Sequence, residues 1–422
     1  MQAHICQGVA GRSGFSVRGH QKAGVPDVQH HTVASLVLCV ASGIAGCRES
    51  PLAGVDGKSP GSGGIVWHVA GIRPPPLSGT LANDDSTVFA YRGGRSFTAI
   101  RLRDQRTLWT ATGDESQDEF DAMRGVELCA GSVVFGTAGA AYAITPTSGQ
   151  RRWRWAPSQG GLLNYAGPAC AVSMLIFATG KPMRVYGVDA LTGVEQWSTP
   201  FGDRVGGEGF MTTPAATDGI AVMCSREFSL PFRGAISAFS VATGAVLWRF
   251  EWTPPPPLVD ASCSERVRVK DGIVAASVDD GRVFGLDLQT GALRWTAPPV
   301  ALFATPSDER SVAIVDSTVI VGSLSGRLIA HDLRTGALRW NVADTPSARS
   351  IFNYGLVGNR GEVVGVNLSG WIVSYDVATG KRRWAVATGL KLNERVFLPE
   401  GVTLTSDYAV GIAGDGLYAI RR

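Results

Sequence analysis

Residues 283–295 read VFGLDLQTGALRW, and the phrase returns as LIAHDLRTGALRW at 328–340 and as IVSYDVATGKRRW at 372–384. Each copy begins with a run that alternates as a strand does. It then passes through Thr-Gly into a second run that carries a tryptophan. Glycine readily takes the positive φ that a short hairpin with a bulge requires. The phrase therefore predicts two antiparallel strands joined by a tight turn.

Tryptophan recurs along the chain at intervals of 42, 44, 44, 51, 47, 45 and 44 residues. The eight positions are Trp67, Trp109, Trp153, Trp197, Trp248, Trp295, Trp340 and Trp384. A repeat of this length that ends in an aromatic residue after a turn is typical of one four-stranded propeller blade. The turn glycine stands at Gly193, Gly244, Gly291, Gly336 and Gly380, and Ser148-Gly149 supplies it in a sixth unit.

The two ends of this array complete each other. Residues 65–69, IVWHV, supply a tryptophan strand with no phrase before it, and residues 414–422, GDGLYAIRR, begin the phrase without reaching a tryptophan. Pairing of the two fragments would close a ring and remove both open sheet edges. Seven full units and one split unit predict an all-β, eight-bladed propeller over residues 65–422. A seven-bladed ring with a separate tryptophan is the alternative.

Composition agrees with a single ring and excludes some partners. The 53 glycines and 22 prolines among 422 residues suit many short strands joined by turns. The net charge is only +3, and no stripe of Lys and Arg with interleaved aromatic residues occurs. We therefore expect a monomeric ring that does not bind nucleic acid.

The N-terminal region predicts export and a lipid anchor. Residues 33–46, VASLVLCVASGIAG, form an uncharged apolar run that is short for a bilayer span and suits a secretory signal. The following Cys47 completes Ile-Ala-Gly-Cys, which resembles the bacterial lipoprotein processing site and implies lipid attachment at this cysteine. We expect a leader over 1–46 and a Gly/Ser/Pro-rich tether over 47–64. An ordinary N-terminus with a chance cysteine is the alternative.

Four further cysteines follow the tether, at Cys129, Cys170, Cys224 and Cys263. An exported protein meets an oxidising compartment, where disulfides persist. Four cysteines allow three pairings, between which the sequence does not choose, and buried free thiols are the alternative. His331 occupies a strand position where other units carry Leu or Tyr, so we interpret it as a packed side chain.

The repeat resembles the PQQ-binding-like propeller family, in which Ala-x-Asp-x-x-Thr-Gly-x-x-x-Trp docks neighbouring blades. Asp287, Thr290, Gly291 and Trp295 match this motif closely. The resemblance covers residues 65–422 and implies a blade-docking role for the eight tryptophans and the turn glycines. The family contains quinone-dependent dehydrogenases and non-catalytic members, among them the outer-membrane lipoprotein that assists β-barrel insertion (BamB-like). A fold of this kind does not by itself determine function.

The dehydrogenase alternative implies PQQ, calcium and an adjacent Cys-Cys disulfide. No Cys-Cys pair occurs in the sequence. The acidic pair in Asp279-Asp280-Gly281 is interpreted as a solvated turn, and Trp155 and Trp371 as blade packing. No HExxH or phosphate-binding loop is present. We therefore expect no catalytic residues, no metal and no cofactor.

Aromatic and arginine side chains in two connections are candidates for partner binding, because such residues anchor many interfaces. The first connection, SREFSLPFRG at 225–234, offers Arg226, Phe228, Leu230, Phe232 and Arg233. The second, PSARSIFNY at 346–354, offers Arg349, Phe352 and Tyr354. The alternative is a loop that folds its own apolar side chains beneath it.

These patterns together predict a lipid-anchored, non-catalytic propeller scaffold of the bacterial envelope, at the outer membrane and facing the periplasm. It would bind envelope proteins through rim loops, and barrel-assembly machinery is the partner implied by the resemblance. A PQQ-dependent oxidoreductase and a receptor for glycan or another envelope polymer are the alternatives.

Overall fold

The computed structural model describes residues 64–72, 81–93, 96–112, 124–137, 139–161, 163, 167–180, 182–201, 209–217, 219–227, 233–256, 263, 266–278, 280–299, 309–323, 326–343, 355–366, 371–387, 401–413 and 416–422. All of them belong to the second of two compact units, Pro51–Arg422. They form strands and turns without helices, so no helix long and apolar enough to cross a membrane occurs among them.

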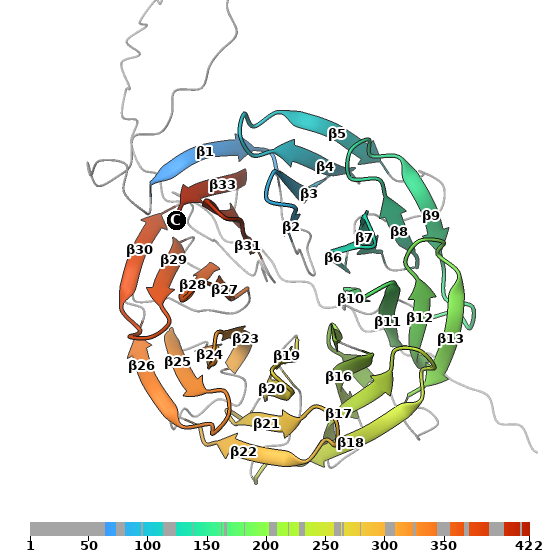
Figure 1. The fold of residues 1–422 in the computed structure, drawn as a ribbon, viewed down its shortest axis with the longest axis vertical. Coiled ribbons are helices and arrows are strands. Elements are labelled where there is room, and N and C mark those ends of the chain that lie inside the picture. The colour runs from blue at the N-terminus through green and yellow to red at the C-terminus, as the bar shows by residue number, and fades with distance from the viewer. Residues whose placement is uncertain are drawn as a thin grey trace, which may run out of the picture. The chain divides into compact units, whose positions relative to one another are not determined.

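The strands form eight antiparallel sheets arranged as a ring, which confirms the predicted eight-bladed propeller (Figure 1). Blade 1 contains β2 (Ala82–Asn83), β3 (Thr87–Gly93), β4 (Ser96–Arg101) and β5 (Thr107–Thr112). Blade 2 contains β6 (Arg124–Cys129), β7 (Ser132–Gly136), β8 (Ala141–Ile144) and β9 (Arg151–Trp155). Blade 3 contains β10 (Ala169–Ala171), β11 (Met174–Gly180), β12 (Met183–Asp189) and β13 (Glu195–Pro200). Blade 4 has five strands: β14 (Gly209–Met211), β15 (Ala215–Thr217), β16 (Ile220–Glu227), β17 (Arg233–Ser240) and β18 (Val246–Trp252).

The remaining blades follow the same inner-to-outer order. Blade 5 contains β19 (Arg268–Lys270), β20 (Ile273–Ser277), β21 (Val283–Asp287) and β22 (Leu293–Ala297). Blade 6 contains β23 (Glu309–Val315), β24 (Thr318–Ser323), β25 (Arg327–Asp332) and β26 (Leu338–Ala343). Blade 7 contains β27 (Val357–Asn359), β28 (Glu362–Val366), β29 (Trp371–Asp376) and β30 (Arg382–Ala387). Blade 8 combines β31 (Val402–Leu404), β32 (Tyr408–Ala413) and β33 (Gly416–Arg421) with β1 (Ile65–Ala70).

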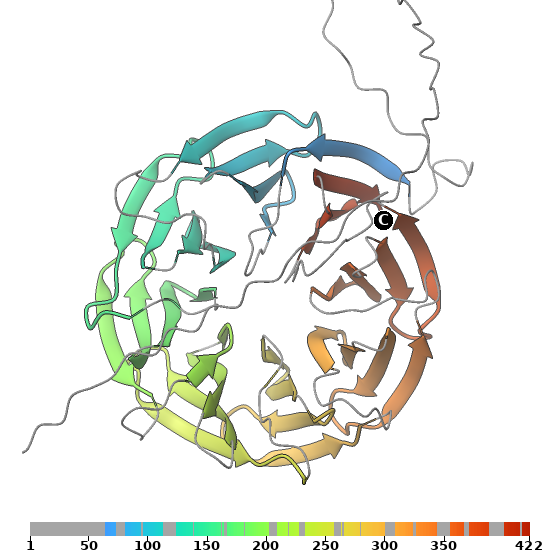
Figure 2. The same ribbon diagram turned by 180° about the vertical axis from the view of Figure 1, so that it is seen from behind.

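The ring closes through blade 8, where strands from opposite ends of the sequence pair. β1 is the outer strand and lies antiparallel to β33, with Trp67 opposite Ala419 and Val69 opposite Leu417. Figure 2 shows the two strands side by side from behind, in blue and red. The predicted closure by an N-terminal strand is therefore confirmed. Because β1 and β33 pair with each other, neither is left without a partner strand.

The repeated phrase folds as a five-residue turn between the third and fourth strands of a blade. In blade 5, Oδ1 of Asp287 accepts hydrogen bonds from the main-chain N–H and the hydroxyl of Thr290, both at 2.9 Å. Gly291 follows with φ of 70° and donates its N–H to the Asp287 carbonyl at 2.9 Å. The aspartate thus caps a turn whose tight exit requires the left-handed conformation that glycine adopts most easily.

This turn is also the docking point for the tryptophan of the preceding blade. A Cβ added to Gly291 would lie 2.6 Å from the ring of Trp248, so the indole lies directly against the glycine backbone. The indole Nε1 donates to a carbonyl in the same turn at 2.6–3.0 Å in six blades. The pairs are Trp109 with Pro146, Trp153 with Ala190, Trp197 with Val241, Trp248 with Leu288, Trp295 with Leu333 and Trp340 with Val377. One hydrogen bond and one close apolar contact therefore fix neighbouring blades at six of the eight seams.

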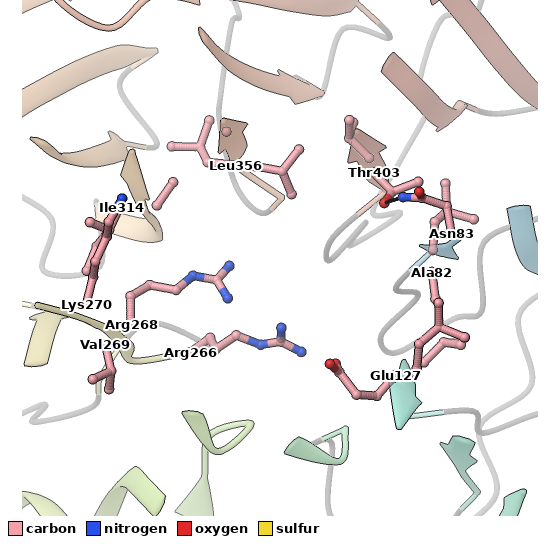
Figure 3. A pocket seen from close by; sticks show the side chains of 17 residues that line it. Ala82, Asn83, Glu127, Arg266, Arg268, Val269, Lys270, Ile314, Leu356 and Thr403 are labelled. Atoms are coloured by element: carbon pink, nitrogen blue, oxygen red, sulfur yellow. Dashed lines mark hydrogen bonds between the residues drawn. The ribbon is translucent and has the colours of Figure 1, made fainter. Parts of the chain in front are cut away.

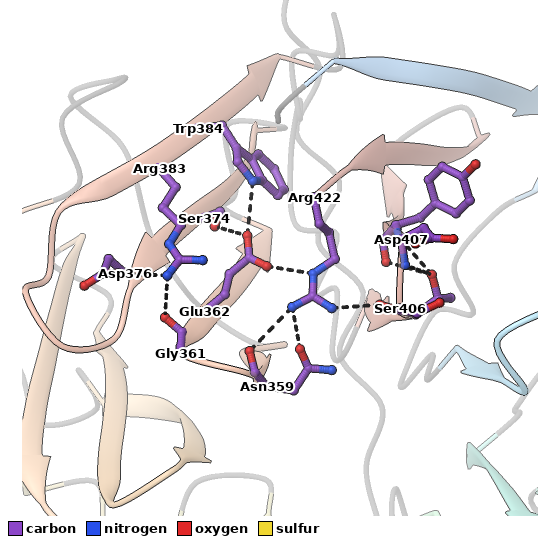
Figure 4. Close-up of polar contacts among 12 residues, drawn as sticks. Asn359, Gly361, Glu362, Ser374, Asp376, Arg383, Trp384, Ser406, Asp407 and Arg422 are labelled. Atoms are coloured by element: carbon purple, nitrogen blue, oxygen red, sulfur yellow. Dashed lines mark hydrogen bonds and ion pairs between the residues drawn. The ribbon is translucent and has the colours of Figure 1, made fainter. Parts of the chain in front are cut away.

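The seam between blades 7 and 8 departs from this arrangement. In blade 8 the fourth strand is β1, so the repeated turn does not follow the third strand, β33. Trp384 donates from Nε1 to the carboxylate of Glu362 at 3.1 Å instead of to a carbonyl of the next blade. The same carboxylate accepts from Ser374 Oγ at 2.5 Å and from Arg422 Nε at 2.7 Å (Figure 4). Arg422 also donates to the Thr405 carbonyl and to Asn359. A buried charge network replaces the turn at this seam.

The strand order sorts the connections onto two faces of the ring. Turns between the first and second strands and between the third and fourth strands share one face, which we call the short-turn face. Connections between the second and third strands and those that lead from one blade to the next share the other, the long-connection face. The longest blade-to-blade connection, 253–267, has 15 residues, whereas most turns between the third and fourth strands have five. The longest connections therefore all lie on one face.

Two disulfides join neighbouring parts of the ring and select one of the three open pairings. Cys129, at the end of β6, bonds to Cys170 in β10, so the innermost strands of blades 2 and 3 are linked. Cys224, in β16 of blade 4, bonds to Cys263, which precedes β19 of blade 5 and bridges Val278. Both bonds cross a boundary between blades.

Candidate functional site

Blade 4 carries the largest departure from the regular blade, on the long-connection face. β16 and β17 are eight residues long, and β14 pairs with the far end of β16, where Phe210 lies opposite Arg226. The inner strand β15 pairs with the near end of the same strand. The added strand supports the base of the connection 228–232, which was predicted to bind a partner. Antiparallel pairing on both sides of β16 makes this hairpin a rigid support.

The predicted partner-binding residues are only partly described. Arg226 pairs through its main chain with Gly234, and Arg233 begins β17 with an exposed side chain. Phe228, Leu230 and Phe232 lie between these two strands, outside the described residues. The lipid-attachment cysteine and the second connection also lie outside them; these are Cys47, Arg349, Phe352 and Tyr354.

Three further residues considered in the sequence, Asp280, Trp155 and Trp371, have roles in packing or in holding a turn. Asp280 is the one that was interpreted wrongly: its side chain is 1% exposed and forms an ion pair with Arg282 at 2.5 Å, so it is not solvated. The guanidinium of Arg282 bends back over the turn and also donates to the Thr253 carbonyl at 3.0 Å, which excludes water from the carboxylate. Trp155 is buried against Phe177, and Trp371 packs against the core between blades 6 and 7.

His331 is buried in β25, as a packed side chain would be. Its Nδ1 lies 3.1 Å from the Gly336 carbonyl, so the ring is held by the docking turn of its own blade. Burial lowers the pKa of His331, because the desolvated site disfavours the imidazolium. The neutral ring therefore packs in the interior of the blade.

The innermost strands enclose a cavity of about 430 Å³ within the ring (Figure 3). Its described lining comes from blades 1, 2, 5, 6, 7 and 8 and combines polar and apolar surface in similar amounts. The charged side chains are three cations, Arg266, Arg268 and Lys270, and one carboxylate, Glu127. All three cations belong to blade 5. In Figure 3 the two guanidinium groups extend into the cavity from the side opposite Glu127.

The donor set of this cavity does not fit the calcium of a quinoprotein site. Calcium requires six or more oxygen ligands, and the described lining offers one carboxylate among three cations. Across the described part of the chain, no three His, Cys, Asp or Glu side chains come together as a metal site. The disulfides join residues 41 and 39 positions apart, in place of the adjacent pair of the dehydrogenases.

The repeat, the docking tryptophans and the eight closed blades define a propeller of the quinoprotein type. The chain belongs to the family described as outer membrane protein assembly factor BamB, whose model matches residues 58–160, 137–386 and 303–422. The three matches together extend over the whole ring. No curated protein sequence matches the chain.

Several solved structures share the fold. BamB from Moraxella catarrhalis superposes with a TM-score of 0.61 at 16% identity, over 84% of this chain and 98% of that one. The computationally designed Ika8 protein gives 0.65 at 16% identity, over 86% and 99%. A europium-containing methanol dehydrogenase gives 0.61 at 14% identity, over 84% and 85%. At these identities the likeness concerns architecture alone, since one propeller fold carries many functions.

Sequence reasoning missed both charged clusters. Glu362 and Arg422 are 60 residues apart, and Arg422 lies beyond the repeated phrase. The cavity residues have a detectable signal, because Glu127 and Arg268 occupy the same position in their blades: each pairs with the residue seven positions further on. Alignment of the eight units on the turn after the first strand places these two charges in one column.

Proposed function

We propose that this protein is a non-catalytic scaffold of the bacterial envelope that docks barrel-assembly proteins on its long-connection face. Membership of the BamB family supports the class of partner. The choice of surface rests on blade 4, where an additional strand supports the longest hairpin of the described chain. The rest of the ring is a rigid frame, and rigid frames with varied loops on one face suit recognition.

The proposal includes a lipid anchor at Cys47 and a tether over residues 48–64, so that the ring would be held close to the outer membrane from the periplasmic side. Metabolic labelling with an alkyne fatty acid tests the anchor. The chain should be labelled and Cys47→Ala should not be, while Cys170→Ala serves as the matched cysteine control. Label that persists in Cys47→Ala contradicts the anchor.

Retention of partners from detergent-solubilised envelopes of the source bacterium tests the docking face. The immobilised full chain should retain barrel-assembly subunits, identified by mass spectrometry. Arg226→Glu/Arg233→Glu, which reverses two charges at the base of the blade 4 hairpin, should lose most of this material. Arg334→Glu is the control, because Arg334 is exposed in a turn of the short-turn face. Failure of the unaltered chain to retain such subunits overturns the partner, and equal retention by all three overturns the face.

The absence of catalysis is tested separately. Addition of PQQ and calcium to the purified chain should give no dye reduction with alcohol or aldose substrates. Turnover that depends on both additions would replace the scaffold proposal with an oxidoreductase.

A further inference from the structure

The innermost strands form a ring of equivalent positions in which nearly every side chain is small. The position that pairs seven residues onward is occupied, blade by blade, by Ala82, Glu127, Ala169, Ala215, Arg268, Ala313, Val357 and Thr403. Alanine, valine and threonine complete the inner strand in six blades, so packing of the channel does not require a long charged side chain. Arg268 and Glu127 are departures that need a separate reason.

Blade 5 adds two further cations to Arg268. Lys270 lies two residues later on β19, and Arg266 precedes the strand, bridged to Thr213 of blade 4. All three side chains are partly buried and line the same cavity. With Glu127 as the one carboxylate among the described lining residues, three cations against one anion leave a formal charge of +2 in a confined space. Cations gathered on one wall of a cleft raise the local positive potential and so attract anions.

The orientation of Arg268 is fixed before any ligand arrives. Its Nε donates to the Val312 carbonyl of blade 6 at 2.8 Å, which holds the guanidinium plane at the boundary between the two blades. A guanidinium held in place loses less side-chain entropy on binding an oxyanion, and its fork matches carboxylate and phosphate oxygens in a bidentate manner. The opposite wall is also fixed, since the amide of Asn83 donates to Thr403 Oγ1 at 2.5 Å and to the Leu404 carbonyl at 3.2 Å.

We propose that this cavity binds a small organic polyanion that carries at least two carboxylate or phosphate groups, with blade 5 as its recognition wall. The volume of about 430 Å³ lies within the range of small-molecule sites. Arg266, Arg268 and Lys270 supply the attraction, while Glu127 disfavours ligands that place negative charge across the whole cavity. The inference does not depend on protein docking, because the cavity is lined by inner strands and not by the blade 4 hairpin.

Calorimetric titration of the purified full chain tests the proposal, with pyrophosphate and citrate as probes and sodium chloride at matched ionic strength as the reference. At least one probe should bind with one ligand per chain. Lys270→Gln and Arg268→Gln should each weaken binding about tenfold or more, since a charge-assisted hydrogen bond contributes roughly 1.5–3 kcal/mol and 1.4 kcal/mol is tenfold. Arg334→Gln, on the exposed short-turn face, should leave the affinity unchanged.

Glu127→Gln should change the affinity in the opposite direction. Loss of the carboxylate removes repulsion, so the affinity for the bound probe should rise several-fold. Circular dichroism and the unfolding temperature without probe establish that each variant is folded. If Arg268→Gln does not fold, Lys270→Gln alone is used to test the site. No binding of either probe beyond sodium chloride overturns the proposal. Equal weakening by Arg334→Gln, or unchanged binding in folded Lys270→Gln, overturns the site.

Discussion

Arg422 and Glu362 form an ion pair in which Nε donates to Oε2 at 2.7 Å, and their side chains are 9% and 4% exposed. The pair joins the segment that follows β33 to the second strand of blade 7. It occupies the place where six other seams use a turn carbonyl and a glycine. The carboxylate also accepts from an indole and a hydroxyl, so three donors from two blades surround the buried charge. The seam between blades 7 and 8 therefore depends on a buried ion pair, whereas six other seams depend on indole packing and one hydrogen bond each.

Removal of either partner of this pair should be costly. Glu362→Ala leaves the Arg422 cation without its counter-ion and the Trp384 N–H without its acceptor, and a buried ion pair broken on one side costs roughly 3–5 kcal/mol. Urea unfolding followed by tryptophan fluorescence measures the change. Glu251→Ala is the control: its pair with Arg249 has side chains 26% and 46% exposed, and a surface pair contributes about 1 kcal/mol or less. Similar losses in both variants would show that the seam is not held by the buried pair.

The glycine against the tryptophan ring should be intolerant of a methyl group. Gly291→Ala combines a positive φ with a Cβ 2.6 Å from Trp248, whereas Gly272→Ala has nearly the same φ, 72° against 70°, and nothing within 4 Å. The control should lose about 1–2 kcal/mol for the left-handed conformation, and Gly291→Ala about 1–3 kcal/mol more for the displaced indole. The free energy of unfolding of the two variants gives this difference directly. Equal costs would mean that the indole moves aside freely.

Acid should weaken the repeated turns together. The Arg294 guanidinium holds the pKa of Asp287 at about 2, and Arg339 and Arg383 do the same for Asp332 and Asp376. Because these folded-state values lie below the ordinary 3.8, the carboxylates stabilise the fold fully above that pH, and the contribution is lost as the pH falls from about 4 through about 2. The variant with all three aspartates changed to asparagine should show a flatter dependence of the unfolding free energy over this window. An unchanged slope would contradict the linkage.

Reduction should loosen two blade boundaries. Each disulfide closes a loop of about forty residues, for which the chain-entropy model gives roughly 4 kcal/mol. The unfolding temperature should fall on addition of dithiothreitol, and Cys129→Ser/Cys170→Ser should reproduce part of that fall. Peptide mapping without reductant should recover Cys129 linked to Cys170 and Cys224 linked to Cys263. Any other linkage contradicts the observed pairing.

The blade repeat could be predicted because its signal is local and periodic. Trp295 and Gly291 act within one unit and its neighbour, so the same letters return at each blade, and the split unit around Trp67 indicates where the ring closes. The blade 1 turn shows the limit of the pattern: Gln105 adopts the positive φ of 61° that glycine takes elsewhere. In that seam, Nε1 of Trp67 has no hydrogen-bond acceptor among the described residues.

The candidate sites depend on distances that only the closed ring establishes. Glu127 and Arg268 are separated by 141 residues and meet across one cavity because the blades between them curve through part of a circle. The disulfide partners are likewise set by contact between blades, which the spacing of cysteines does not encode. Asp280 was misinterpreted for a related reason, since a two-residue ion pair with Arg282 hides a carboxylate that a turn composition would leave in water.

Blade 8 combines strands from opposite ends of the ring sequence, and this affects the order in which the ring can assemble. β1 precedes every other described strand of the ring in the sequence and its partner β33 follows them all, so β1 has no neighbour in its sheet until the rest of the ring has been synthesised. Until then the growing arc has an unpaired margin at each side, which is the kind of surface that invites pairing with other chains. A chaperone that shields β1 until β33 has been synthesised would protect the nascent protein better than one that acts on any single blade.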